Sequence, residues 1–127
     1  MKKEDFYAEA QADSTGPLQG VRVLEATNYG AGPYCGTVLA DFGAESIKCE
    51  MPGSGDPVRH MGPFVGCEPG IENSTWHLSI GRNKKSITLD FGKPEGQAVF
   101  RELASKADIL VENFTPGTMA KWGLGDQ

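Results

Sequence analysis

Short apolar runs alternate along the chain with apolar residues at helical spacing, which is the pattern of an α/β protein. Residues 21–26 and 108–112 are largely apolar, so each predicts a buried strand. Residues 45–50 and 86–89 alternate between polar and apolar positions, which predicts two further strands. The chain therefore carries the elements of a sheet with helices between its strands.

Two helices are predicted between these strands. Pro33 fits the first turn of one helix, because its missing N–H costs nothing there, and Gly43 is a natural stop. The other helix starts at residues 92–95, where Pro and Glu are favourable in a first turn. Apolar residues at helical spacing predict the buried faces, namely Tyr34, Val38, Leu39 and Phe42 in the first helix and Val99, Phe100, Leu103 and Ala107 in the second.

The connection between the two strand–helix–strand units is long. Residues 51–73 are dense in Gly and Pro, which indicates an ordered loop, and Trp76, Leu78 and Ile80 then alternate briefly. The whole order predicts an open, mostly parallel, Rossmann-like α/β sheet with flanking helices and right-handed crossovers.

Three loops of this sheet carry unusual sequences. They span residues 29–36, which are glycine-rich, residues 81–90, which begin with a basic turn, and residues 111–117, which end in Asn-Phe-Thr-Pro-Gly. Ligands of open α/β sheets bind beyond the carboxyl ends of the strands. Since each loop leaves or adjoins a strand end, we expect all three at one edge, around a phosphorylated ligand.

The composition indicates one globular domain, with 39% hydrophobic and 23% charged residues among 127. Residues 1–19 are polar, so we expect a flexible lead-in before a domain at 20–127. A net charge of −5 argues against nucleic acid as a partner. No apolar run approaches the roughly 18 residues of a membrane span. No signal peptide is recognised, so we expect a cytoplasmic protein that does not enter a membrane.

The cysteines and histidines show no metal-ligand spacing, so no metal is predicted. Cys35 in a helix and Cys49 in a strand are interpreted as small buried apolar residues. A nucleophilic Cys35 is the alternative, because a helix N-terminus lowers a thiol pKa. His60 and His77 are interpreted as structural or exposed.

The glycine-rich loop matches the dinucleotide fingerprint only in part. That pattern needs G-x-G-x-x-G, and after Gly30 and Gly32 the third glycine, Gly36, comes one residue late. Glu50 ends a strand where a ribose-binding acid belongs. The alternative is a tight turn that packs the helix on the strand, with backbone N–H groups still able to meet an anion.

Two further stretches allow two interpretations each. The basic turn with Arg82, Lys84 and Lys85 is either a phosphate clamp or a solvated turn. Asn113 and Phe114 either hydrogen-bond and stack against a nucleotide base, or form a capping Asn and a core Phe.

Taken together, the motifs resemble a known family. In order along the chain they are G-V-R-V-L-E, A-G-P-Y-C, L-A-D-F-G-A-E-S-I-K, P-G-S-G-D, R-N-K-K-S-I-T-L-D, K-P-E-G and A-D-I-L-V-E-N-F-T-P-G. This set is similar to the N-terminal portion of the class III coenzyme A transferases, the family of formyl-CoA transferase and carnitine CoA-transferase. The α-methylacyl-CoA racemases share its fold and motifs. The resemblance runs from residue 20 to about 125.

The resemblance implies that this portion binds coenzyme A. Ala31 matches a residue at the loop that meets the thiol end, and Leu89 matches a position near the adenosine. Asn113 and Phe114 match residues that contact the CoA, and Lys121 matches a basic residue near its phosphates. Lys85, in the basic turn, is a weaker candidate for the approach of those phosphates.

Two departures from the family and the position of its nucleophile limit what the resemblance implies. Gly30 stands where formyl-CoA transferase has a glutamine, which speaks against formate or oxalate as the acyl group, and Met51 stands where many members have an arginine near the nucleotide. In the family, an aspartate beyond the equivalent of Gln127 attacks the acyl-CoA. No catalytic residue is therefore assigned within this chain.

The resemblance favours the CoA-binding portion of a transferase that moves CoA between an acyl-CoA and a carboxylic acid. We expect this portion to be truncated relative to the family and inactive without the downstream region. We also expect it to act as a homo-oligomer or with a complementing chain. Alternatives are a racemase-type fragment, a non-catalytic α/β binding or assembly module, and a nicotinamide-dependent oxidoreductase fragment.

Overall fold

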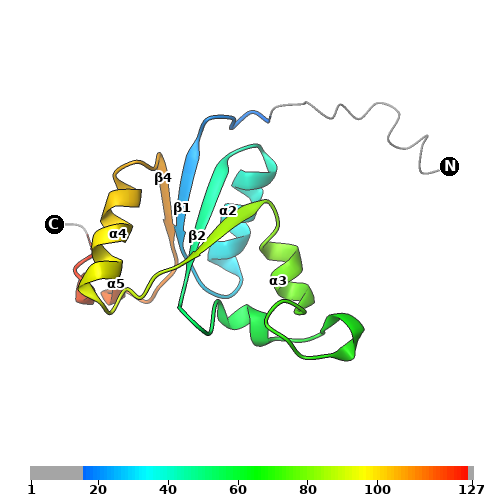
Figure 1. Ribbon diagram of the computed structural model, residues 1–127. Coiled ribbons are helices and arrows are strands. Elements are labelled where there is room, and N and C mark those ends of the chain that lie inside the picture. The colour runs from blue at the N-terminus through cyan, green and yellow to red at the C-terminus, as the bar shows by residue number, and fades with distance from the viewer. Residues whose placement is uncertain (1–15, 126–127) are drawn as a thin grey trace.

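The computed structural model describes residues 16–125, and its four strands form one entirely parallel sheet (Figure 1). The strands are β1 (Arg22–Ala26), β2 (Glu45–Glu50), β3 (Lys84–Thr88) and β4 (Ile109–Glu112). Their spatial order is β3-β2-β1-β4. This order, together with the parallel pairing of β1 with both β2 and β4, confirms the predicted open α/β sheet.

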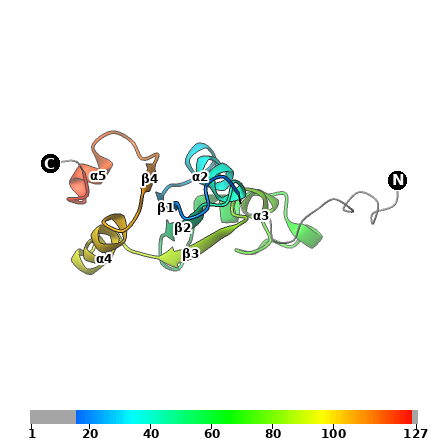
Figure 2. The ribbon, with the colours of Figure 1, turned by 90° about the horizontal axis from the view of Figure 1, so that it is seen from above.

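Helices cover both faces of the sheet. Those of the described residues are α2 (Ala31–Asp41), α3 (Thr75–Ile80), α4 (Pro94–Ala104) and α5 (Thr118–Lys121), with 3₁₀ turns η1 (Pro57–His60) and η2 (Val65–Cys67). Seen along the strands, α4 and α5 lie on one side, and α2 and α3 lie on the other (Figure 2). We call these two sides the α4 face and the α2 face. No helix among residues 16–125 has the length and apolar character needed to cross a bilayer.

The α4 face holds the apolar core. Leu24 and Cys49 point into it from the strands, and both side chains are nearly inaccessible. Phe100 of α4 packs on them and meets Phe91 at a ring-centroid distance of 4.9 Å, edge to face. Burying side chains of this size stabilises a fold by roughly 2–3 kcal/mol each. The prediction that Phe100 is buried is confirmed, although Val99 is 44% exposed.

The α2 face is different, because α2 approaches the sheet through small residues. Its buried residues are Gly32, Pro33, Gly36, Thr37 and Ala40. A Cβ at Gly36 would lie 2.0 Å from the carboxylate of Glu25, so only glycine fits there. The predicted apolar face of α2 is therefore wrong at two of its four positions: Tyr34 and Phe42 are 56% and 53% exposed, whereas Val38 and Leu39 are half-buried.

Several local predictions need correction. Residues 75–80 form the helix α3, because Ser74 caps its N-terminus by accepting the His77 N–H. The 51–73 loop contains η1 and η2, and β3 begins at Lys84, two residues before the predicted start. Cys49 is buried as predicted, but Cys35 is exposed, since it lies on the outer side of α2.

The predicted lead-in lies mostly outside the described residues, which begin at Gly16. Its last residues are anchored to the end of α2. The Leu18 N–H donates to the Phe42 carbonyl at 2.9 Å, and Gly16 packs so closely on that carbonyl that a Cβ there would lie 2.0 Å from its oxygen.

Candidate functional site

The carboxyl ends of β1 and β4 are adjacent at the centre of the site. The loop that leaves β1 leads to α2 on one side of the sheet, whereas the loop that leaves β4 leads to α5 on the other side (Figure 2). In open α/β sheets, ligands bind in the crevice that forms where neighbouring connections diverge in this way. The loops at this edge therefore form the candidate site.

Asn113 bridges the crevice between β4 and β1. Its side-chain amide donates from Nδ2 to the Asn28 carbonyl at 2.9 Å, and its Oδ1 accepts the Asn28 N–H at 2.9 Å. A Cβ at Gly32 would lie 2.7 Å from the Asn113 side chain, so the second glycine of the loop makes room for this bridge. Ala31, which directly precedes Gly32, is the exposed first residue of α2. The structure thus brings two predicted site residues, Ala31 and Asn113, to the same crevice.

A hollow beside this crevice has an aromatic wall. Phe114 and Trp122 meet edge to face with ring centroids 5.1 Å apart, and Trp122 lies 5.5 Å from Phe91. The hollow is lined by Asn28, Cys49, Glu50, Met51, Leu89, Phe91, Phe114 and Trp122. Two more predicted site residues, Leu89 and Phe114, therefore lie together here. Lys121 is the exposed residue immediately before Trp122.

The basic turn does not join this site. Arg82 pairs with Asp41 of α2 at 2.5 Å, and Lys85 pairs with Glu45 at the start of β2. Lys84, with its amine buried, lies 2.9 Å from the Glu25 carboxylate, and burial lowers the pKa of Lys84. All three residues precede or open β3, so they lie at the amino end of the sheet. The expectation that residues 81–85 adjoin a carboxyl edge is wrong, since only residues 89–90 of that loop do.

Glu50, the candidate ribose-binding acid, has its carboxylate occupied by hydrogen bonds from other groups of this chain. Its carboxylate accepts from Arg59 Nε at 2.6 Å and Arg59 Nη2 at 2.8 Å. It also accepts from Ser86 Oγ and from the Asp56 N–H. Burial opposes the charge, but these hydrogen bonds outweigh it and lower the pKa of Glu50 to about 2. Sequence reasoning missed Arg59, and its position nine residues after a strand-terminal acid carries no signal.

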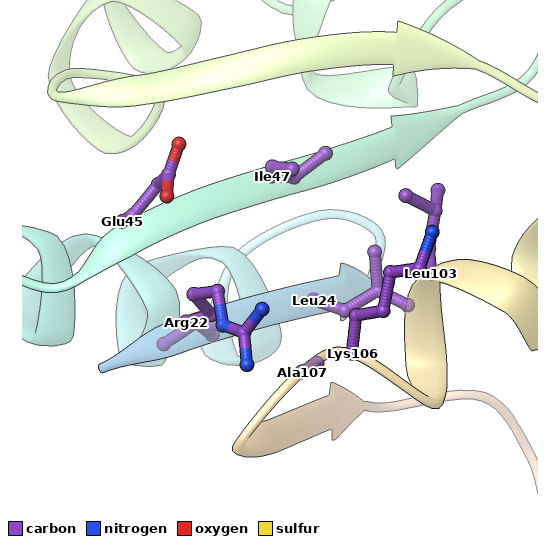
Figure 3. Close-up of a pocket in the computed structure, with 8 residues that line it drawn as sticks. Arg22, Leu24, Glu45, Ile47, Leu103, Lys106 and Ala107 are labelled. Atoms are coloured by element: carbon purple, nitrogen blue, oxygen red, sulfur yellow. The ribbon is translucent and has the colours of Figure 1, made fainter. Parts of the chain in front are cut away.

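Another hollow lies away from this edge of the sheet. The hollow in Figure 3 lies at the amino end of the strands and is lined by Leu24, Ile47 and Leu103, together with Arg22 and Lys106. Both of these basic side chains already have an acidic partner: Arg22 pairs with Asp108 at 3.6 Å, and Lys106 pairs with Glu102 at 2.7 Å. Within residues 16–125, no three His, Cys, Asp or Glu side chains are grouped so that they could hold a metal ion. The carboxyl edge therefore remains the candidate site.

Comparison with known proteins gives a consistent family. The family model described as CoA-transferase family III matches residues 18–127. The succinyl-CoA–D-citramalate CoA-transferase of Chloroflexus aurantiacus is 50% identical over 111 residues, which are 86% of this chain and 26% of that protein. The human succinyl-CoA:glutarate CoA-transferase is 47% identical over 110 residues, covering 86% of this chain and 24% of that protein.

Solved structures agree with this result. A CAIB/BAIF family protein from Brucella suis superposes with a TM-score of 0.79 at 38% identity, covering 89% of this chain and 30% of that one. A protein of Mycobacterium tuberculosis superposes with a TM-score of 0.77 at 40% identity, covering 88% of this chain and 29% of that one. The chain thus spans roughly a quarter of the length of the curated relatives it matches.

Proposed function

The chain belongs to CoA-transferase family III, and from that premise we propose that residues 20–127 are the part of such an enzyme that binds coenzyme A. The observation that carries the proposal is the crevice at the carboxyl ends of β1 and β4. Four of the residues that match CoA-contacting positions of the family, Ala31, Leu89, Asn113 and Phe114, come from three loops and lie around this crevice and the adjoining hollow.

Each residue has a role that its surroundings support. Ala31 opens α2, where free backbone N–H groups and the helix dipole favour an electron-rich group such as the thioester end of CoA. Leu89 and Phe114 line the apolar hollow proposed for the adenosine part. Asn113 shapes the crevice by holding Asn28, and its exposed amide keeps a second N–H for the ligand.

The CoA phosphates are assigned to Lys121. This residue is exposed beside the aromatic wall. Lys85 is removed from the proposed site, because its ammonium is paired with Glu45 at the other end of the sheet. Met51 is 48% exposed at the edge of the hollow and offers apolar contact where many family members have an arginine.

The reaction proposed for the whole enzyme needs a nucleophilic carboxylate, and no residue of this chain is assigned that role. An aspartate oxygen attacks the thioester carbonyl, the CoA thiolate leaves, and a mixed anhydride forms. The thiolate then attacks the enzyme carbonyl, which releases the first acid and leaves an aspartyl-CoA thioester. The acceptor carboxylate next attacks this thioester, the CoA thiolate leaves, and a second mixed anhydride forms. The thiolate then attacks the acceptor carbonyl, which gives the new acyl-CoA and frees the aspartate. We place this aspartate in a region without a counterpart here, since about three quarters of the relatives' length has none.

Assembly with further polypeptide is part of the proposal. Leu110 on the outer strand β4 and Tyr34 on α2 are 46% and 56% exposed, although both are large apolar residues. One relative, the succinyl-CoA–L-malate CoA-transferase of Chloroflexus aurantiacus, is named in alpha and beta subunits, at 47% and 46% identity to this chain. We propose that this chain works as a homo-oligomer or with a complementing chain that supplies the aspartate.

Calorimetric titration of the purified chain tests the CoA assignment. We expect saturable CoA binding and none of NADH. Lys121→Ala should weaken CoA binding about 3- to 10-fold, the effect of losing one partly exposed charged contact. Lys85→Ala is the matched control and should bind CoA as the unaltered chain does. A folded chain that ignores CoA, or an equal loss in both lysine variants, would contradict the proposal.

A further inference from the structure

The loop that begins α2 turns at a residue in an unfavourable backbone conformation. Tyr29 has a φ of 63°, in the left-handed region that non-glycine residues rarely occupy. Its side chain is 57% exposed, so apolar packing of the ring does not hold it there. A backbone conformation of this kind persists only where surrounding groups fix it.

The carboxylate of Asp56 holds the backbone of Tyr29 in this conformation. It belongs to the loop after β2 and is fully buried. Its Oδ1 accepts the Tyr29 N–H at 3.1 Å and also the Val58 N–H at 2.9 Å. One carboxylate oxygen therefore joins the loop after β1 to the start of η1.

Lys48 holds the other oxygen of this carboxylate. Its Nζ lies 2.7 Å from Asp56 Oδ2, and the side chains of the pair are 5% and 0% exposed. The same ammonium donates to the Thr27 carbonyl at 2.8 Å. The Lys48–Asp56 pair thus contacts the β1–α2 loop at Thr27 and at Tyr29, while Asn113 holds Asn28 from the opposite side.

We propose that the buried Lys48–Asp56 pair is a positioning element that fixes Tyr29, and through it the first turn of α2, in the form that receives the CoA thioester. This inference rests on the proposed function and adds residues that do not touch the ligand. Because Tyr29 directly precedes Gly30 and Ala31, a change in its backbone dihedrals redirects the N–H groups that open α2. The acceptor oxygen of Asp56 is the decisive atom, and Lys48 orients it.

Two paired variants of the full chain separate positioning from stability. K48M/D56N removes both charges but keeps a carbonyl oxygen for the Tyr29 N–H, whereas K48M/D56A also removes that oxygen. Because both charges are removed, neither variant leaves an unpaired buried charge. Replacing a buried ion pair with neutral groups in this way is often tolerated. Leu103→Ala serves as the stability control, since Leu103 packs on the α4 face.

The measurements are the CoA dissociation constant by calorimetry and the melting temperature of each variant. We expect K48M/D56N to bind CoA within about 3-fold of the unaltered chain. K48M/D56A loses the acceptor of both the Tyr29 and Val58 N–H groups and should bind at least about 10-fold more weakly. Leu103→Ala should melt earlier with an unchanged constant. Equal binding by the two double variants, or weakening in Leu103→Ala that matches K48M/D56A, overturns the proposal.

Hydrogen exchange of the Tyr29 amide gives a test that needs neither a variant nor CoA. The amide should exchange slowly, although its side chain faces solvent, because it donates to a buried carboxylate. Exchange at the rate of an unstructured chain overturns the inference. A chain that protects this amide but does not bind CoA retains the loop anchor and contradicts the proposed function instead, so the two failures are distinguishable.

Discussion

On the α4 face the strands present Leu24 and Cys49 to Phe100, whereas on the α2 face the same strands present Glu25 and Lys48, and all five side chains are buried. Side chains alternate between the faces of a strand, so neighbours in sequence occupy opposite environments. Lys48 and Cys49 are such a pair. One sheet therefore combines an apolar core with a buried ionic layer.

The ionic layer is costly unless every charge is paired. Glu25 lies against Lys84, Lys48 lies against Asp56, and Glu50 accepts two hydrogen bonds from Arg59. Desolvation of such charges can cancel their attraction, so this layer contributes less stability than the apolar face. Its hydrogen bonds are directional, however, and they end on loop backbone such as the Tyr29 and Asp56 N–H groups. The α4 face therefore supplies most of the stability, and the α2 face places the loops.

Breaking one buried pair should have the largest effect. Arg59→Met leaves the Glu50 carboxylate buried without its partner, and we expect a loss of about 3–5 kcal/mol in the free energy of unfolding. The double variant Arg59→Met/Glu50→Gln should recover most of that loss, because no uncompensated charge remains. Urea unfolding at pH 7 measures both. No recovery in the double variant would mean that shape, not charge, dominates this face.

Low pH should weaken the ionic α2 face, because its carboxylates become protonated. Glu50 has a pKa of about 2 in the folded chain against an ordinary 4.5, so its contribution is complete above about pH 5 and is lost as pH falls towards 2. We expect this residue to account for about 2–3 kcal/mol of acid destabilisation. Arg59→Met/Glu50→Gln should flatten that part of the pH profile.

Phe100→Ala is the matched control for the acid experiment. It opens space in the apolar face and should cost about 3 kcal/mol at every pH, because no titrating group is involved. A pH-dependent cost for Phe100→Ala, or an unchanged acid profile in Arg59→Met/Glu50→Gln, would contradict the separation of the two faces.

The sequence predicted the sheet well because its signals are local. Apolar runs marked β1 and β4, alternation of polar and apolar residues marked β2 and β3, and Gly43 and Pro94 marked helix ends. The faces of α2 were predicted wrongly, because a sheet face that carries Glu25 and Lys84 accepts small residues and leaves Tyr34 exposed. Helical periodicity assumes that the apolar side of a helix packs inward, and here the requirement for close approach overrides it.

The candidate site was predicted in part for a related reason. Motif order identified Asn113, and the structure places it in the crevice with Ala31. Lys85 was misplaced, since a basic turn before a parallel strand lies at the opposite edge from the loops that follow strands. The anchoring role of Asp56 could not be predicted, because it depends on a contact between loops 27 residues apart.

Substitution of an exposed cysteine should have the smallest effect on the free energy of unfolding. The reactivity of the three cysteines also distinguishes the buried α4 face from the exposed surface. Cys49 faces the apolar side, and burial raises its pKa to about 12, whereas Cys35 and Cys67 are exposed. An alkylating reagent at pH 8 should therefore modify Cys35 and Cys67 quickly and Cys49 only after urea is added, because the thiolate is the reactive form. Cys35→Ser should change the free energy of unfolding by less than about 0.5 kcal/mol. Rapid modification of Cys49 in the folded chain would mean that the apolar face opens to solvent, and would weaken its assignment as the stabilising side of the sheet.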